Sequence, residues 1–92
     1  MEQKVESFAK VKNKLGLHVR PATTIAKLLQ KKKAKVTLTY KGESVNARSI
    51  MSIMILAAPK NAKLKIEVEG VDAKETLNDL LQAFDNKFGE DR

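Results

Sequence analysis

The segment 63–69 alternates between apolar and charged residues more regularly than any other part of this chain. Its apolar residues are Leu64, Ile66 and Val68, and every other position holds Lys or Glu. Because successive side chains of a strand point to opposite faces of a sheet, this pattern predicts a strand that is buried on one face and solvated on the other. The segments 5–11 and 34–40 alternate as well, although Phe8 falls on the outward side. Such a sheet needs helices on only one of its faces.

Two longer stretches carry apolar residues at helical spacing. In the segment 19–32 the apolar stripe consists of Ala22, Ile25, Ala26, Leu28 and Leu29. Pro21 falls in the first turn, where a missing N–H costs little. The second helix is predicted to start at Asp72, which with Glu75 has the spacing of a capping box. Its apolar residues follow in helical register to the C-terminus: Leu77, Leu80, Leu81, Phe84 and Phe88.

Two short elements complete the predicted fold. The Lys41-Gly42 pair predicts a tight turn into a strand over 43–47, and Ser49 can cap a short helix that extends to Leu56. The predicted order is β-α-β-β-α-β-α within a single domain, residues 1–92. We expect an α+β open-faced two-layer sandwich, in which three helices cover one face of a four-stranded antiparallel sheet.

Composition and charge narrow the class of protein. The chain has 42% apolar and 32% charged residues and no cysteine, and it contains neither a signal-peptide run nor a stretch of transmembrane length. We expect a cytoplasmic monomer that does not insert into membranes. Residues 1–66 carry fifteen Lys and Arg against three Asp and Glu, whereas residues 67–92 carry three against eight. A basic region of net charge +12 predicts an anionic partner, either nucleic acid or an acidic protein surface.

The one histidine of the chain, His18, falls at the start of the predicted helix 19–32, two residues before Arg20. A lone imidazole, without cysteine or a spaced carboxylate cluster, predicts neither a metal site nor a cofactor site. An imidazole near its reference pKa of about 6.5 is largely neutral at cytoplasmic pH and is therefore a nucleophile. A helix start offers free N–H groups and a partial positive charge to a phosphate. The pair is thus a candidate for phosphoryl chemistry.

Nucleic-acid binding is the alternative function for a small basic α+β domain with this element order. RNA-binding sheets stack bases on exposed aromatic residues of their central strands. The strands here offer only Phe8 and Tyr40, and Tyr40 lies on the predicted buried face. A Gly-x-x-Gly loop is also absent from the sequence. These features disfavour nucleic acid as the partner.

Two segments resemble a known family. The stretch Asn13-Lys14-Leu15-Gly16-Leu17-His18-Val19-Arg20-Pro21-Ala22 resembles the active-site signature of the HPr family, the histidine phosphocarrier proteins of the bacterial phosphotransferase system. The stretch Val45-Asn46-Ala47-Arg48-Ser49-Ile50-Met51-Ser52-Ile53-Met54 resembles the regulatory-serine segment of that family. The length and the predicted element order are also similar to the family's.

The resemblance implies a phosphoryl carrier rather than an autonomous enzyme. His18 would accept a phosphoryl group at Nδ1 from phosphorylated enzyme I and pass it to sugar-specific or regulatory acceptor components. Arg20 would be the neighbouring cation, and Ser49 would match the serine that a dedicated kinase phosphorylates in some bacteria. From the residues alone, Ser49 can equally be a simple N-cap.

The short helix carries more apolar side chains than one buried stripe needs. Among residues 49–56 six are large and apolar. Some of them must face outward, and an exposed apolar patch usually marks a docking surface. Ile50, Met51 and Met54 are the candidates, because the corresponding helix of HPr proteins contacts enzyme I and the downstream acceptors.

Some positions depart from the family's usual pattern. Val19 stands where Ala or Thr is usual, and Ser52 stands where many serine-regulated members have Gly. The lead-in 13–16 and the tail 86–91 are more similar to the nitrogen-related branch of the family. Sugar uptake and a purely regulatory relay therefore both stay open.

Overall fold

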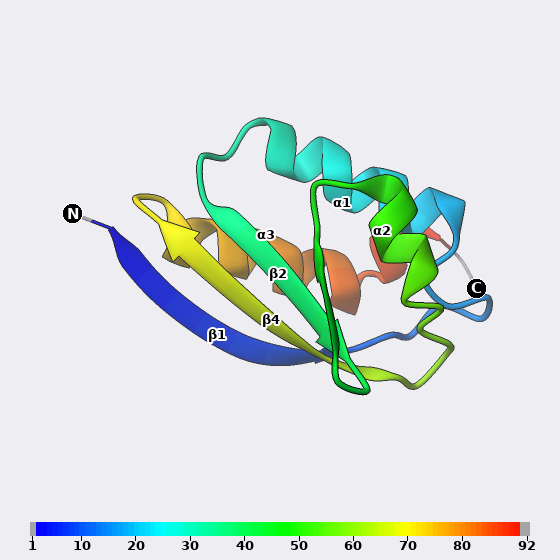
Figure 1. Ribbon diagram of the computed structural model, residues 1–92. Coiled ribbons are helices and arrows are strands. Elements are labelled where there is room, and N and C mark those ends of the chain that lie inside the picture. Colours follow the sequence, from blue (N-terminus) through cyan, green and yellow to red (C-terminus); the bar gives the residue numbers. More distant parts are fainter. Residues whose placement is uncertain (1, 91–92) are drawn as a thin grey trace.

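The computed structural model of the protein describes residues 2–90. Its elements are β1 (Gln3–Lys10), α1 (Val19–Gln30), β2 (Lys35–Tyr40), β3 (Glu43–Asn46), α2 (Ile50–Ile55), β4 (Lys63–Gly70), α3 (Ala73–Asp85) and a 3-10 turn η1 (Lys87–Gly89). The strands form one antiparallel sheet in the order β1-β4-β2-β3. Helices α1 and α3 cover one face of this sheet, and α2 packs beside α1 (Figure 1). The predicted α+β open-faced sandwich is confirmed.

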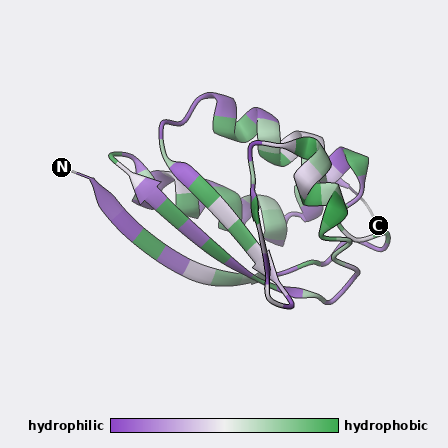
Figure 2. Ribbon diagram, viewed as in Figure 1, coloured by the Kyte–Doolittle hydropathy of each residue, from purple (hydrophilic) through white to green (hydrophobic). Residues whose placement is uncertain are grey.

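The central strand β4 is the segment with the cleanest alternation. Its Val68 pairs with Val5 of β1 on one side and with Val36 of β2 on the other. Because all strands keep this register, their apolar residues share the face beneath the helices, while charged residues occupy the open face. Figure 2 shows the resulting alternation of hydrophilic and hydrophobic residues along the strands. The inward side chains of β4 are at most 1% exposed: Leu64, Ile66 and Val68.

The last helix anchors this core. Leu80 is fully buried on α3, in one apolar cluster with Leu64 and Ile66 of the sheet. We expect Leu80→Ala to lower the free energy of unfolding by about 2–5 kcal/mol, because it removes buried methyl groups and leaves a cavity. Urea unfolding measures the change. Leu15→Ala is the matched control: Leu15 is 67% exposed, so its loss should stay below about 0.5 kcal/mol. Equal losses in the two variants would contradict this assignment of the core.

The predicted capping box at the start of α3 is wrong. Asp72 occupies the N-cap position, but its side chain makes no capping hydrogen bond to α3. Its carboxylate instead accepts hydrogen bonds from the backbone N–H of Lys33 at 2.8 Å and of Ala34 at 2.9 Å. These donors lie in the loop that enters β2 and have no helical partner, so they compete successfully for the carboxylate. Burial disfavours its ionisation, but these hydrogen bonds, with that of Lys33 the strongest influence, hold the pKa of Asp72 below its ordinary value.

The C-terminal end of α1 is held by Arg48, whose role the sequence did not indicate. Its guanidinium donates hydrogen bonds to the carbonyl oxygens of Leu29 at 2.7 Å, Lys32 at 2.7 Å and Ala34 at 2.9 Å. The last carbonyls of a helix lack intrahelical partners, so a cation stabilises them. Lys32 also reaches Asp79 of α3 at 2.9 Å. One end of α1 is thereby tied to its neighbours.

The chain after α3 differs from the predicted helix. The helix ends at Asp85, and Lys87 and Phe88 adopt the left-handed conformation with φ of 54° and 53°. This turn brings the ring of Phe88 edge-on against Phe84, with 4.8 Å between ring centroids. Burial of an aromatic ring stabilises a backbone turn that is locally unfavourable. The turn also redirects the chain, so that Glu90 lies at the start of α1.

Among the described residues, 2–90, no helix has the length and apolar character needed to cross a membrane.

Candidate functional site

A tight loop places His18 at the start of α1. Gly16 has a φ of 71°, and a Cβ atom at this position would lie 2.3 Å from the carbonyl oxygen of Ala58, so only glycine fits. The backbone N–H of Leu17 donates to that same oxygen at 2.9 Å. His18 is the N-cap: its carbonyl oxygen accepts from the N–H of Ala22 at 3.0 Å, but its side chain makes no capping bond. The imidazole therefore remains available for chemistry.

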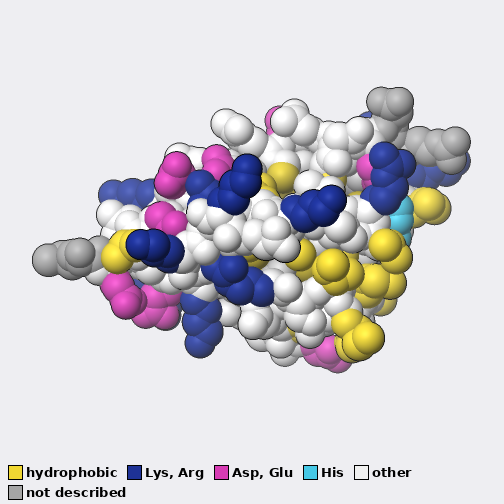
Figure 3. Space-filling view, turned by 90° about the horizontal axis from the view of Figure 1, so that it is seen from above, with side chains coloured by type: hydrophobic (Ala, Val, Ile, Leu, Met, Phe, Trp, Pro, Cys, Tyr) yellow, Lys and Arg dark blue, Asp and Glu magenta, His cyan; other side chains and the backbone are white. Residues whose placement is uncertain are grey.

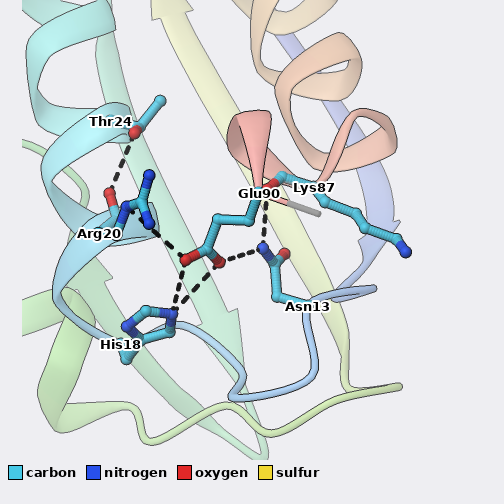
Figure 4. A network of polar contacts seen from close by, with 6 residues as sticks. All are labelled: Asn13, His18, Arg20, Thr24, Lys87 and Glu90. Atoms are coloured by element: carbon cyan, nitrogen blue, oxygen red, sulfur yellow. Dashed lines mark hydrogen bonds and ion pairs between the residues drawn. The ribbon is translucent and has the colours of Figure 1, made fainter. Parts of the chain in front are cut away.

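The imidazole of His18 contacts a carboxylate from the other end of the chain. Its Nε2 lies 3.1 Å from Oε2 and 3.2 Å from Oε1 of Glu90 (Figure 4). A carboxylate only accepts hydrogen bonds, so the hydrogen-bond network assigns the proton to Nε2. In the neutral ring the lone pair then belongs to Nδ1, which lies on the side of the ring away from Glu90. Nδ1 is the nucleophilic atom of this arrangement.

The Glu90 carboxylate is held by a buried amide. Asn13 is fully buried, and its Nδ2 donates to Oε1 of Glu90 at 2.6 Å and to the carbonyl oxygen of Lys87 at 2.8 Å. A flipped amide would place its oxygen against both acceptors, so this orientation is the one that the contacts allow. Within residues 2–90, no group donates to Asn13 Oδ1.

The same contacts determine the charge of Glu90, whose side chain is 12% exposed. Burial alone would raise the pKa of this carboxyl group. The hydrogen bonds from Asn13 and His18 and the electrostatic attraction of His18 and Arg20 outweigh burial and hold its pKa below the ordinary value. Glu90 is therefore an anion at neutral pH.

Arg20 completes the group of charges. Its Nε lies 3.9 Å from Oε2 of Glu90, a loose ion pair, and its side chain is 77% exposed. The guanidinium is thus directed toward the site without being bound tightly within it. It is free to approach an anion beside His18.

The predicted pair His18 and Arg20 lies together in the structure, whereas Asn13 and Glu90 were not predicted as site residues. Both belong to the lead-in and tail segments, which indicated only a branch of the family. Asp91, the last residue of that tail segment, lies outside the described residues. No local pattern predicts a contact between residues 18 and 90.

Ser49 occupies the N-cap of α2, as predicted. Its Oγ accepts a hydrogen bond from the backbone N–H of Ser52 at 3.2 Å. The backbone N–H of Ser52 is therefore an ordinary capping donor. Ser49 is half-buried, and its regulatory role remains a prediction.

An apolar surface lies beside the histidine. Of the candidate docking residues, Ile50 is 38%, Met51 74% and Met54 40% exposed, whereas Ile53 and Leu56 are buried. The excess of apolar side chains on α2 thus faces solvent. We call the exposed set the apolar rim; it consists of Leu15, Val19, Ile50, Met51, Met54 and Ile55. Figure 3 shows hydrophobic side chains gathered next to the histidine.

The structure gives little support for a metal site or for a nucleic-acid-binding site. In the part of the chain that the structure describes, no three His, Cys, Asp or Glu side chains gather as metal ligands. On the open face of the sheet Phe8 is 56% exposed, with Nζ of Lys63 4.9 Å from its ring centre. Tyr40 is half-buried and packs against the core on the other face. This is not the aromatic platform that base stacking requires.

Comparison with known proteins agrees with the geometry. The family described as "PTS HPr component phosphorylation site" matches residues 5–86. The phosphocarrier protein HPr of Chlamydia trachomatis is 42% identical over 80 residues, 87% of this chain and 73% of that protein. That of Xylella fastidiosa is 38% identical over 81 residues, 88% and 91% of the two chains. The crystal structure of HPr from Thermoanaerobacter tengcongensis superposes with a TM-score of 0.90 at 34% identity, and the match covers 96% of this chain and 99% of that one.

The matched region contains His18, Arg20 and Ser49, and it extends from within β1 to the end of α3. Sequence and fold lead to the same conclusion: the chain belongs to the HPr family, the phosphoryl carriers of the phosphotransferase system.

Proposed function

We propose that Nδ1 of His18 is the atom that carries the phosphoryl group between phosphorylated enzyme I and an acceptor component. The observation that supports this proposal is the contact of Nε2 with Glu90, which leaves Nδ1 as the unprotonated nitrogen. In the transfer, the Nδ1 lone pair forms the new N–P bond while the bond between phosphorus and its carrier atom on enzyme I breaks. The electron pair of the broken bond stays with enzyme I. The second transfer repeats these events with His18 as the donor.

The surrounding charges suit both the free and the phosphorylated ring. Substitution at Nδ1 while Nε2 keeps its proton makes the ring cationic, and the Glu90 carboxylate at 3.1 Å balances that charge. The aspartate of a Ser-His-Asp triad acts on its histidine in the same sense. On the other side of the ring, Arg20 and the start of α1 stabilise the transferring phosphoryl group. Transfer then needs only positioning and charge stabilisation, and the protein is a carrier rather than an autonomous catalyst.

The apolar rim is proposed as the docking surface for enzyme I and for the acceptor components. Ile50, Met51 and Met54 expose their side chains beside the site, where burial against a partner is favourable. The basic segment 1–66 favours association with an acidic partner surface. A monomeric state and a cytoplasmic location belong to the same proposal.

The proposed carrier function is tested by incubation with enzyme I and phosphoenolpyruvate. Intact-mass measurement should show the gain of one phosphoryl group, and the label should be lost in acid, as expected for phosphohistidine. Omission of enzyme I should prevent the gain. A protein that stays unlabelled while a known HPr is labelled in the same reaction would contradict the proposal. Nucleic-acid binding predicts instead a salt-sensitive affinity for RNA or DNA.

We propose that phosphorylation of Ser49 by a serine kinase weakens docking. Phosphate would place about −1.5 to −2 charges next to Ile50 and Met51. At a helix N-terminus this charge is compatible with the fold, but its hydration opposes burial of the neighbouring apolar rim. We expect Ser49→Asp to fold normally and to raise the Michaelis constant for enzyme I about tenfold with little change in maximal rate.

Ser49→Ala is the matched control for the capping role. Loss of the bond to Ser52 should cost about 0.5–2 kcal/mol of stability and leave docking unchanged. Steady-state kinetics with enzyme I and two melting curves compare the variants. If Ser49→Asp transfers phosphate as well as the parent protein, Ser49 is only an N-cap.

A further inference from the structure

We infer that Asn13 is a positioning residue for phosphoryl transfer: its buried amide fixes the Glu90 carboxylate, which in turn fixes the orientation and tautomer of His18. This inference rests on the proposed role of His18. Asn13 touches neither the phosphoryl group nor the imidazole. It acts indirectly, through the 2.6 Å hydrogen bond from its Nδ2 to Oε1 of Glu90.

The side chain of Asn13 is an unusual choice for stability alone. It is fully buried, yet no group among residues 2–90 donates to its Oδ1. Buried polar atoms ordinarily have partners, because an unsatisfied one costs free energy. Both Nδ2 hydrogens, in contrast, are used, and both are directed to the chain after α3. The amide is therefore suited to hold that segment in place.

The segment is held at two points. The ring of Phe88 packs against Phe84, and Asn13 binds the carbonyl oxygen of Lys87. Glu90 lies two residues after Phe88, with its carboxylate between Asn13 and His18 (Figure 4). Its remaining contact is the 3.9 Å pair with the exposed Arg20. Without Asn13, water would compete for the carboxylate, and the contact with Nε2 would loosen.

The consequence for chemistry lies in the imidazole proton. While Glu90 accepts from Nε2, the neutral ring keeps Nδ1 unprotonated. A ring without this partner exchanges its proton between both nitrogens and rotates more freely. A smaller share of molecules then presents the Nδ1 lone pair at the start of α1. A small displacement of a reacting atom is sufficient to slow transfer strongly.

The test measures the tautomer and the transfer rate separately. Nitrogen-15 NMR of the unphosphorylated protein reports which ring nitrogen of His18 carries the proton. Rapid-quench kinetics with phosphorylated enzyme I report single-turnover transfer. We expect Asn13→Ala to shift the ring signals toward averaging of the two tautomers and to slow transfer about tenfold. Asn13→Asp, nearly isosteric, should act in the same direction, because its carboxylate repels Glu90.

A double-mutant cycle tests whether Asn13 acts through Glu90. Glu90→Ala should also slow transfer, and Asn13→Ala should add no further loss in that background. Asp72→Ala is the control for stability: it removes the two hydrogen bonds to Lys33 and Ala34 at another part of the molecule. Its melting temperature should fall while the ring signals and the transfer rate stay those of the parent.

Two results would overturn the inference. The first is that both Asn13 variants keep the ring signals and the transfer rate of the parent. The second is that the Asn13→Ala/Glu90→Ala double variant slows transfer by the product of the two single effects. The failure of the proposed function would look different, since the parent itself would then carry no label on His18. The tautomer measurement does not depend on transfer and therefore tests the Asn13 contact in either case.

Discussion

Replacement of His18 by Ala is expected to abolish phosphoryl labelling by enzyme I and phosphoenolpyruvate while the fold stays intact. The imidazole is the proposed acceptor, and no second histidine exists in the chain to replace it. The side chain is 30% exposed and makes no capping bond. Its removal should therefore change the free energy of unfolding by less than about 1 kcal/mol. Intact mass after incubation measures the first effect, and thermal unfolding measures the second.

The chemistry of the label provides the control for this experiment. A phosphoryl group on histidine is released in acid, whereas one on a serine hydroxyl persists, so a label on Ser49 would be recognised as such. His18→Ala with undiminished acid-labile label would show that another atom carries the phosphoryl group. If the variant loses the label and its thermal unfolding curve also shows no folded baseline, His18 supports the fold instead.

Arg20→Glu is expected to slow transfer about 100-fold and to leave stability nearly unchanged. A guanidinium beside the acceptor nitrogen stabilises the charge of the transferring phosphoryl group, and a carboxylate there repels it. Because the Arg20 side chain is 77% exposed and its ion pair with Glu90 is loose, the melting temperature should change little. Single-turnover transfer from phosphorylated enzyme I measures the rate.

Long-range attraction between the basic protein and an acidic partner must be separated from this local effect. Lys31→Glu makes the same change of charge at the other end of α1, where the side chain is exposed. Its transfer should slow only modestly, and the difference from the parent should disappear as salt is raised, because salt screens the long-range attraction. If Arg20→Glu behaves like Lys31→Glu, the start of α1 stabilises the phosphoryl group without the guanidinium.

The sequence determined those features that depend on local patterns. Alternation in the segments that became β1, β2 and β4 specified which face of each strand is buried, since the period of a strand leaves no other choice. Helical spacing placed His18 and Ser49 at the starts of α1 and α2, and the excess of apolar residues near Met51 indicated an exposed surface. These features depend only on residues that are close in sequence, so they do not require knowledge of the tertiary contacts.

Only the tertiary structure decided the contacts between distant segments. Helical periodicity continued through Phe88, but the chain leaves the helix at Asp85, because the left-handed turn buries that ring against Phe84. A turn that is unfavourable locally is thus stabilised by packing, and its result is a carboxylate beside His18.

The polar side chains show the same dependence on tertiary structure. Asp72 had the spacing of a helix cap, yet it binds the N–H groups of Lys33 and Ala34, which no local pattern brings near it. Asn13 meets Glu90 across 77 positions of sequence. A polar side chain near a chain turn has many available partners, and only the packed fold determines which one lies within hydrogen-bonding distance.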